Sequence, residues 1–129
     1  MATRSRIYTS RRFDRFAKDA GLDDAVLRAA VECIETGLVS ADLGGHVIKQ
    51  RVARKGQGKS GGYRTIILFR QDERAVFVFG FAKNAKANLT GAELEFYREL
   101  AKDILALSEA EMSSAVKAGS FREILRLGE

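Results

Sequence analysis

Two runs of β-branched and aromatic residues, joined by a short polar turn, constrain the fold of this chain more than any other feature. Residues 63–70 read YRTIILFR, residues 75–81 read AVFVFGF, and the turn between them is QDER. Such runs are typical of buried strands, and their close spacing indicates an antiparallel hairpin. Residues 46–52 (HVIKQRV) alternate polar or basic with apolar side chains, as expected for a strand with one wet face. The sequence therefore predicts three meandering antiparallel strands.

Helices are expected before and after these strands. Apolar residues recur at helical spacing over residues 10–20, with Ser10 as the capping residue, and over residues 23–35, with acidic residues in the first turn. Further helices should begin at Thr90 and at about Ser108, because each is followed three residues later by a glutamate that completes a capping motif.

The order of these elements indicates an α+β fold. We expect a small antiparallel sheet of three to four strands, with two N-terminal helices and C-terminal helices packed on one face of the sheet. Ile7 and Tyr8 could form a further short strand, and residues 121–127 form an amphipathic end.

Length and composition predict one soluble domain over residues 1–129. A chain of 129 residues with 46% hydrophobic and 30% charged residues leaves no room for a second core. No apolar run approaches the roughly 20 residues needed to span a bilayer, and the Arg-rich start leads into no signal-peptide core. We therefore expect a cytoplasmic protein.

Neither a disulfide nor a metal cofactor is expected. Cys33 is the only cysteine and His46 the only histidine, so the chain lacks the ligands of a structural zinc site and cannot form an internal disulfide. The carboxylates fall in helix first turns and on helix faces, without a pair that marks a Mg²⁺ site in the basic half of the chain. We expect no cofactor.

Positive charge is concentrated in the middle of the chain. Residues 49–70 contain no acidic residue, and their basic residues are Lys49, Arg51, Arg54, Lys55, Lys59, Arg64 and Arg70. Residues 53–62 form a cationic loop too rich in glycine for a helix or a packed strand, and Lys83 and Lys86 follow the third predicted strand. A block of this kind favours a nucleic acid as partner.

Aromatic residues and the histidine add candidates to this basic set. An exposed Tyr63 or Phe81 could stack on a base, while the basic side chains grip phosphates. His46 could serve as a general base, but it follows Gly44 and Gly45 at the entrance of a strand, where a structural or solvated turn residue is the favoured interpretation. The expected RNA-binding residues are Arg54, Lys55, Tyr63, Phe81, Lys86 and His46.

The same segments resemble the RelE toxins of bacterial type II toxin–antitoxin systems, within the RelE/ParE superfamily and in particular its HigB-like branch. The resemblance rests on residues 44–54 (GGHVIKQRVAR), 56–64 (GQGKSGGYR) and 79–84 (FGFAKN). It implies metal-independent cleavage of mRNA in the decoding site of the 30S ribosomal subunit. It also implies neutralisation by an antitoxin, commonly a helix-turn-helix DNA-binding protein.

The resemblance also implies roles for single residues. Arg64 matches the arginine that stabilises the scissile phosphate, and Lys49 and Arg51 lie on the strand that presents basic catalytic residues. Lys83 matches the basic residue that ends the following strand. Asn84 stands where some relatives have a second basic residue, and the tyrosine or histidine that some relatives use near Thr90 has no clear match here.

The expected reaction is attack of a ribose 2′-OH on the adjacent phosphodiester, which gives a 2′,3′-cyclic phosphate and a 5′-OH. An arginine can relieve the charge of the transition state, and a lysine crowded by other cations has a lowered pKa and could take the 2′-OH proton. Lys49, Lys59 and Lys83 are the candidates. Two alternatives stay open: poisoning of DNA gyrase, as by ParE-like members of the superfamily, and nucleic-acid binding without catalysis.

Overall fold

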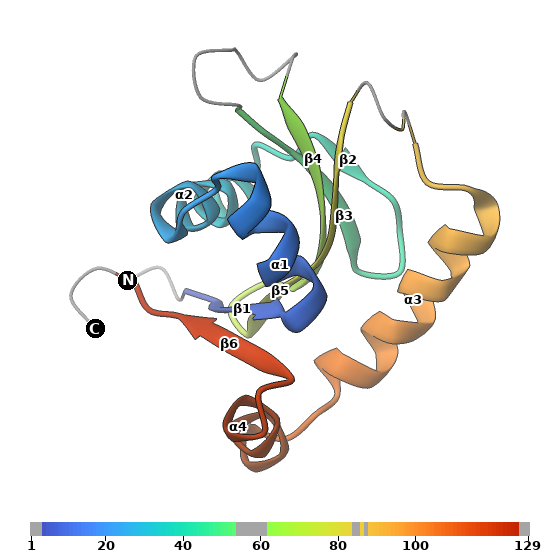
Figure 1. The fold of residues 1–129 in the computed structure, drawn as a ribbon. Helices are drawn as coiled ribbons and strands as arrows, with labels where there is room; N and C mark the ends of the chain where they lie inside the picture. The colour runs from blue at the N-terminus through green and yellow to red at the C-terminus, as the bar shows by residue number, and fades with distance from the viewer. Residues whose placement is uncertain (1–3, 54–61, 84–85, 87, 127–129) are drawn as a thin grey trace.

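The computed structural model describes residues 4–53, 62–83, 86 and 88–126 (Figure 1). The elements, in chain order, are β1 (Arg6–Ser10), α1 (Arg11–Ala20), α2 (Asp24–Glu35), β2 (Ala41–Asp42), β3 (Val47–Val52), β4 (Tyr63–Arg70), β5 (Arg74–Ala82), α3 (Gly91–Leu105), α4 (Glu109–Lys117) and β6 (Phe121–Ile124). The α+β class predicted from the sequence is confirmed.

The strands form one mixed sheet that is larger than expected. Its order is β2-β3-β4-β5-β1-β6, and the predicted meander β3-β4-β5 occupies its middle. β1 pairs in parallel with β5, whereas all other neighbours are antiparallel. The expectation of three to four antiparallel strands is therefore wrong in both number and direction.

The additional strands are short and lie at the two edges of the sheet. β2 has two residues, and β6 occupies part of the amphipathic end. β6 is held by contacts from distant parts of the chain: Arg122 bridges Asp14 of α1 at 3.0 Å and Asp24 of α2 at 2.9 Å. Because pairing partners lie more than a hundred residues away, local sequence pattern carries little information about this strand.

Helices cover both faces of the sheet, which corrects the expectation that they pack on one face. In Figure 1, α1 and α2 lie on one side of the strands and α3 lies on the other. The first core joins residues such as Phe13 and Leu27 to Ile67 and Phe77. The second core joins α3 and α4 to the opposite side of the same strands, through Ile66 among others. The central strands are therefore buried on both sides.

Ser10, Thr90 and Ser108 cap helices where the sequence analysis expected them, whereas Asp23, expected within the second helix, is its capping residue. Ser10 and Asp23 cap α1 and α2, and their side chains accept hydrogen bonds from backbone N–H groups in the first turn. Thr90 and Ser108 begin α3 and α4, each with a complete capping box. Within the described residues, no helix has the length and apolar character needed to cross a membrane.

Candidate functional site

The backbone register of β3 and β4 brings three of the predicted site residues together. Arg51 lies directly opposite Arg64, and Lys49 lies opposite Ile66. Residues opposite each other on antiparallel strands share a face, as do residues two apart on one strand. Lys49, Arg51 and Arg64 therefore lie on the face of the sheet that α3 covers further along.

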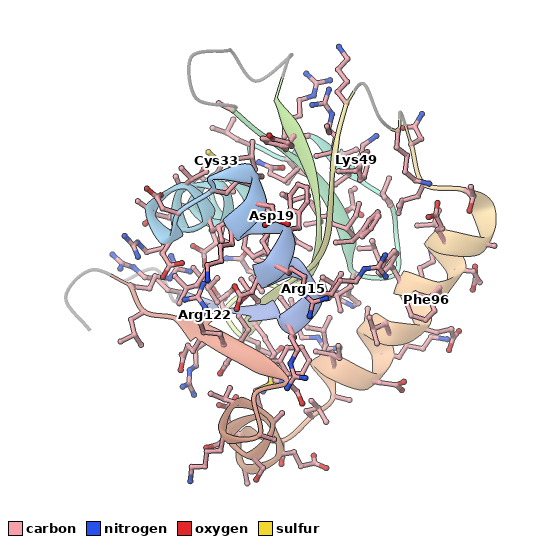
Figure 2. All side chains as sticks on the ribbon, viewed as in Figure 1. Arg15, Asp19, Cys33, Lys49, Phe96 and Arg122 are labelled. Carbon is pink, nitrogen blue, oxygen red and sulfur yellow. The ribbon has the colours of Figure 1, made fainter. Side chains whose placement is uncertain are left out.

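Lys83 joins these three residues from the end of the next strand. It follows β5 directly, and its backbone N–H lies 3.5 Å from the carbonyl oxygen of Gly62. Together the four cations border a surface hollow of about 370 Å³. The residues that line this cationic hollow are Ser40, Ala41, Lys49, Arg51, Arg64, Lys83 and Asn88. Figure 2 labels Lys49, at the end of the sheet away from α4.

Two polar residues of the cationic hollow were missed by the sequence analysis. The Ser40 hydroxyl accepts a hydrogen bond of 3.0 Å from the backbone N–H of Arg51. The Asn88 side-chain oxygen accepts one of 2.8 Å from the Lys49 ammonium group. Both residues lie in connecting segments, where a serine or an asparagine carries no pattern that would distinguish it from an ordinary turn residue.

The charges around the cationic hollow favour binding of an anion. Arg64 is only 6% exposed. Its burial, together with the positive charge of Arg51, lowers the pKa of its guanidinium below the usual value. No carboxylate is among the described residues that line the cationic hollow. An anionic group bound there would reduce the repulsion between the two arginines and accept hydrogen bonds from fixed donors.

The predicted stacking roles of Tyr63 and Phe81 are not supported, because both side chains are buried. Tyr63 is 8% exposed, on the α1 face, where its ring meets that of Phe16 edge to face with centroids 5.5 Å apart. Phe81 is 6% exposed and lies 5.7 Å from Phe79 in the second core. Each of the two aromatic side chains is buried in one of the two cores.

His46 and Lys86 are occupied elsewhere. His46 lies outside β3 with a backbone φ of 65°, and its Nδ1 atom lies 3.1 Å from the carbonyl oxygen of Phe69. Phe69 is five residues along β4 from Arg64, roughly 17 Å by strand geometry, so His46 is a turn residue remote from the cationic hollow. Lys86 forms an ion pair of 2.6 Å with Glu93 in the first turn of α3.

The remaining candidates, Arg54, Lys55 and Lys59, lie outside the described residues, as does Asn84. In the part of the chain that the structure describes, no group of three or more His, Cys, Asp or Glu side chains is arranged to hold a metal ion.

Comparison with known families identifies the chain at family level. No curated protein sequence shows a significant match. Residues 5–124, nearly the whole chain, match the family described as "RelE toxin of RelE / RelB toxin-antitoxin system". The match includes every described residue of the cationic hollow. The chain therefore belongs to the RelE toxin family of toxin–antitoxin systems.

Proposed function

We propose that this toxin is a ribosome-dependent mRNA endonuclease, an mRNA interferase that stops translation by cutting messages in the 30S decoding site. The observation that carries the proposal is the convergence of Lys49, Arg51, Arg64 and Lys83 on one hollow without a lining carboxylate among the described residues. Membership of the RelE family adds support, because that family is generally associated with endoribonuclease toxins. This action would take place in the cytoplasm.

In the proposed reaction, the 2′-oxygen of a ribose forms a bond to the adjacent phosphorus and loses its proton. The bond from phosphorus to the 5′-oxygen of the next nucleotide breaks, and that oxygen gains a proton. The products are a 2′,3′-cyclic phosphate and a 5′-OH end. No oxidant, water or metal ion is needed for this step.

The arginines are proposed to stabilise the transition state. Arg64 is held by burial near the start of β4, and Arg51 lies opposite to it on β3. Two guanidinium groups so fixed can donate to the phosphate oxygens as negative charge builds up on them. Little reorganisation is required at the moment of reaction, because strand pairing already sets their separation.

The lysines are the proposed proton carriers. Lys49 lies two residues from Arg51 on the same strand, and Lys83 enters the cationic hollow from the end of β5. Either amine, when neutral, can accept the 2′-OH proton, and an ammonium group can return a proton to the leaving oxygen. Lys59 remains a third candidate for this role.

The need for the ribosome follows from what the chain itself supplies. The four cations come from one sheet face and its margin, so they contact a phosphate from one side. Alignment of the 2′-oxygen with the breaking bond must come from elsewhere, and this alignment provides a large part of the rate. We assign it to mRNA held in the decoding site.

The test is a reconstituted translation reaction in which mRNA 5′ ends are mapped by primer extension, beside the same mRNA without ribosomes. We expect cuts only with ribosomes, loss of these cuts in Arg64→Ala, and partial retention in Arg64→Lys. Lys117→Ala, an exposed change on α4, is the matched control and should cut normally. Normal cutting by Arg64→Ala would overturn the assignment of the site.

Absence of cuts in every reaction with folded protein would overturn the proposed activity. A supercoiling assay with DNA gyrase would then detect poisoning by binding, and salt-dependent nucleic-acid binding without products would indicate a non-catalytic module. The proposed antitoxin is a helix-turn-helix DNA-binding protein. Purification of the toxin with the product of the adjacent gene, followed by DNA binding of the complex, tests this partner.

A further inference from the structure

A second concave surface runs between α1 and α3 across β5, apart from the cationic hollow. It consists of two adjoining hollows of about 330 and 290 Å³ that share Arg12 and Phe79. We call their combined surface the α1–α3 groove. Its lining residues are Arg12, Phe13, Arg15, Phe16, Asp19, Phe79, Gly80, Ala92, Glu93, Phe96 and Tyr97. Figure 2 labels Arg15 and Asp19 on α1 and Phe96 on α3.

The α1–α3 groove has an aromatic floor and one exposed aromatic wall. Phe79 stacks on Tyr97 with ring centroids 5.9 Å apart, and Tyr97 meets Phe96 edge to face at 5.2 Å. Phe96 is 60% exposed, one of the few large apolar side chains on the described surface. Aromatic side chains presented in this way on a soluble protein are typical of a protein–protein contact.

The net charge available in the α1–α3 groove is positive. Arg12 stacks over the Phe79 ring at 5.0 Å, and neither Arg12 nor Arg15 forms an ion pair with a carboxylate of the described residues. Glu93 is already paired with Lys86. Asp19 remains as an acidic residue on α1. A partner with carboxylates beside an apolar side chain complements this surface.

The two concave surfaces differ in the chemistry that they favour. The described lining of the cationic hollow carries four cations and no carboxylate, which suits a polyanion. The α1–α3 groove carries Asp19 and Glu93 on its walls and an apolar floor. Charges of both signs around an aromatic floor suit a folded peptide segment more than an unbroken phosphate backbone. Protein is therefore favoured over RNA as the occupant.

We propose that the α1–α3 groove is the docking surface for an acidic segment of the antitoxin, which inserts an apolar side chain against Phe79 and Phe96. The groove lies next to the cationic hollow along β5, because Phe79 contacts Phe81, and Phe81 pairs with Arg64. A bound segment would therefore lie at the margin of the candidate site. The proposal rests on family membership and not on RNA cleavage, so it stands or fails independently of the proposed reaction.

The test measures binding of the purified product of the adjacent gene to the full toxin by calorimetry. Phe96→Glu and Arg15→Glu should each raise the Kd by about tenfold or more, as is usual when a central aromatic or arginine contact is lost. Leu38→Glu is the matched control for Phe96, because Leu38 is 66% exposed and lies outside the groove. Lys18→Glu is the control for Arg15, because Lys18 is on the same helix but borders a different hollow. Both controls should keep the Kd of the unmodified toxin.

A growth assay gives a second readout. Phe96→Glu should arrest growth as the unmodified toxin does, but the co-expressed antitoxin should no longer relieve the arrest, while Leu38→Glu stays fully neutralised. An unchanged Kd and normal neutralisation in Phe96→Glu and Arg15→Glu, with unchanged thermal unfolding, would overturn the proposal. Loss of affinity for a fluorescent single-stranded RNA in these variants, with antitoxin affinity intact, would also overturn it and assign the groove to RNA.

Discussion

Arg51 and Arg64 lie directly opposite each other on neighbouring antiparallel strands, and Arg64 is buried. Like charges in this arrangement destabilise a sheet, and the proximity of Arg51 contributes to the lowered pKa of Arg64. An anion bound in the cationic hollow, as proposed above, would offset part of this repulsion.

The first prediction follows from this pair. Arg51→Gln removes one of the opposed charges while it keeps the backbone bond to Ser40, so the free energy of unfolding should rise by roughly 0.2–1 kcal/mol. The same change should reduce mRNA cleavage. Urea denaturation at low and high salt checks the first effect, because screening should shrink the gain. Lys117→Gln is the surface control, and a less stable Arg51→Gln protein would contradict the interpretation.

The second prediction concerns Gly80, near the end of β5. A Cβ atom at this position would lie 2.3 Å from the ring of Phe16, whose other contacts include Tyr63. Gly80→Ala should therefore lower the free energy of unfolding by about 1–3 kcal/mol, since α1 must shift away from the sheet. Chemical denaturation measures the change.

Gly91→Ala provides a matched control for Gly80→Ala. Gly91 begins α3, and an added Cβ there meets no atom within 4 Å. Alanine should stabilise the helix by up to about 1 kcal/mol. Equal effects at the two glycines would show that contact with Phe16 is not the cause.

The sequence predicted the members of the cationic hollow better than their surroundings. Alternation along β3 places Lys49 and Arg51 on one face, and the predicted meander puts Arg64 on the neighbouring strand, but the register that sets Arg64 opposite Arg51 was not predicted. The expected exposure of Tyr63 and Phe81 was wrong, because burial depends on what covers each face of the sheet. That depends on helix packing, which α1 and α3 achieve from opposite sides.

The edges of the fold were less predictable than its centre. β2 is too short to show a period, and β6 pairs with a strand at the other end of the chain. Asn88 belongs to the cationic hollow because its side chain accepts a hydrogen bond from Lys49. Contacts of this kind arise from tertiary structure, and local propensity does not encode them.

The third prediction concerns pH and the attachment of β6. A hydrogen bond from Arg122 is the main cause that holds the pKa of Asp24 below its usual value. A carboxyl group with a lowered pKa stabilises the fold above its ordinary pKa of 3.8, and this contribution is lost as the pH falls further. Asp24→Asn should therefore be less stable than the unmodified protein at pH 7, by at most about 1 kcal/mol because Arg122 and Asp24 are both partly exposed to solvent.

The pH titration of stability provides the check. The difference in free energy of unfolding between Asp24→Asn and the unmodified protein should be constant from pH 7 to about pH 5 and should shrink below about pH 4. Asp103→Asn, an exposed change on α3, is the control. If the difference in free energy of unfolding grew as the pH fell, the pKa of Asp24 would be raised in the folded protein. The stabilising effect assigned to Arg122 would then be wrong.

The fourth prediction is that Asn88 acts on cleavage through Lys49. The 2.8 Å hydrogen bond restrains a flexible lysine at the margin of the cationic hollow, and both residues border the same space. Asn88→Ala should lower the cleavage rate by about tenfold and Lys49→Ala by more, about 100-fold or above, as expected for a proton-transfer group. In the Lys49→Ala background, Asn88→Ala should change the rate by no more than about twofold, because the interaction is already absent.

Single-turnover cleavage in the four proteins of this double-mutant cycle gives the coupling energy between Asn88 and Lys49. Thermal unfolding should be unchanged in Asn88→Ala, because Asn88 is exposed. If Asn88→Ala reduced the cleavage rate by the same factor with and without Lys49, Asn88 would contact the substrate independently or support the fold. The proposal that Asn88 positions Lys49 would then be wrong.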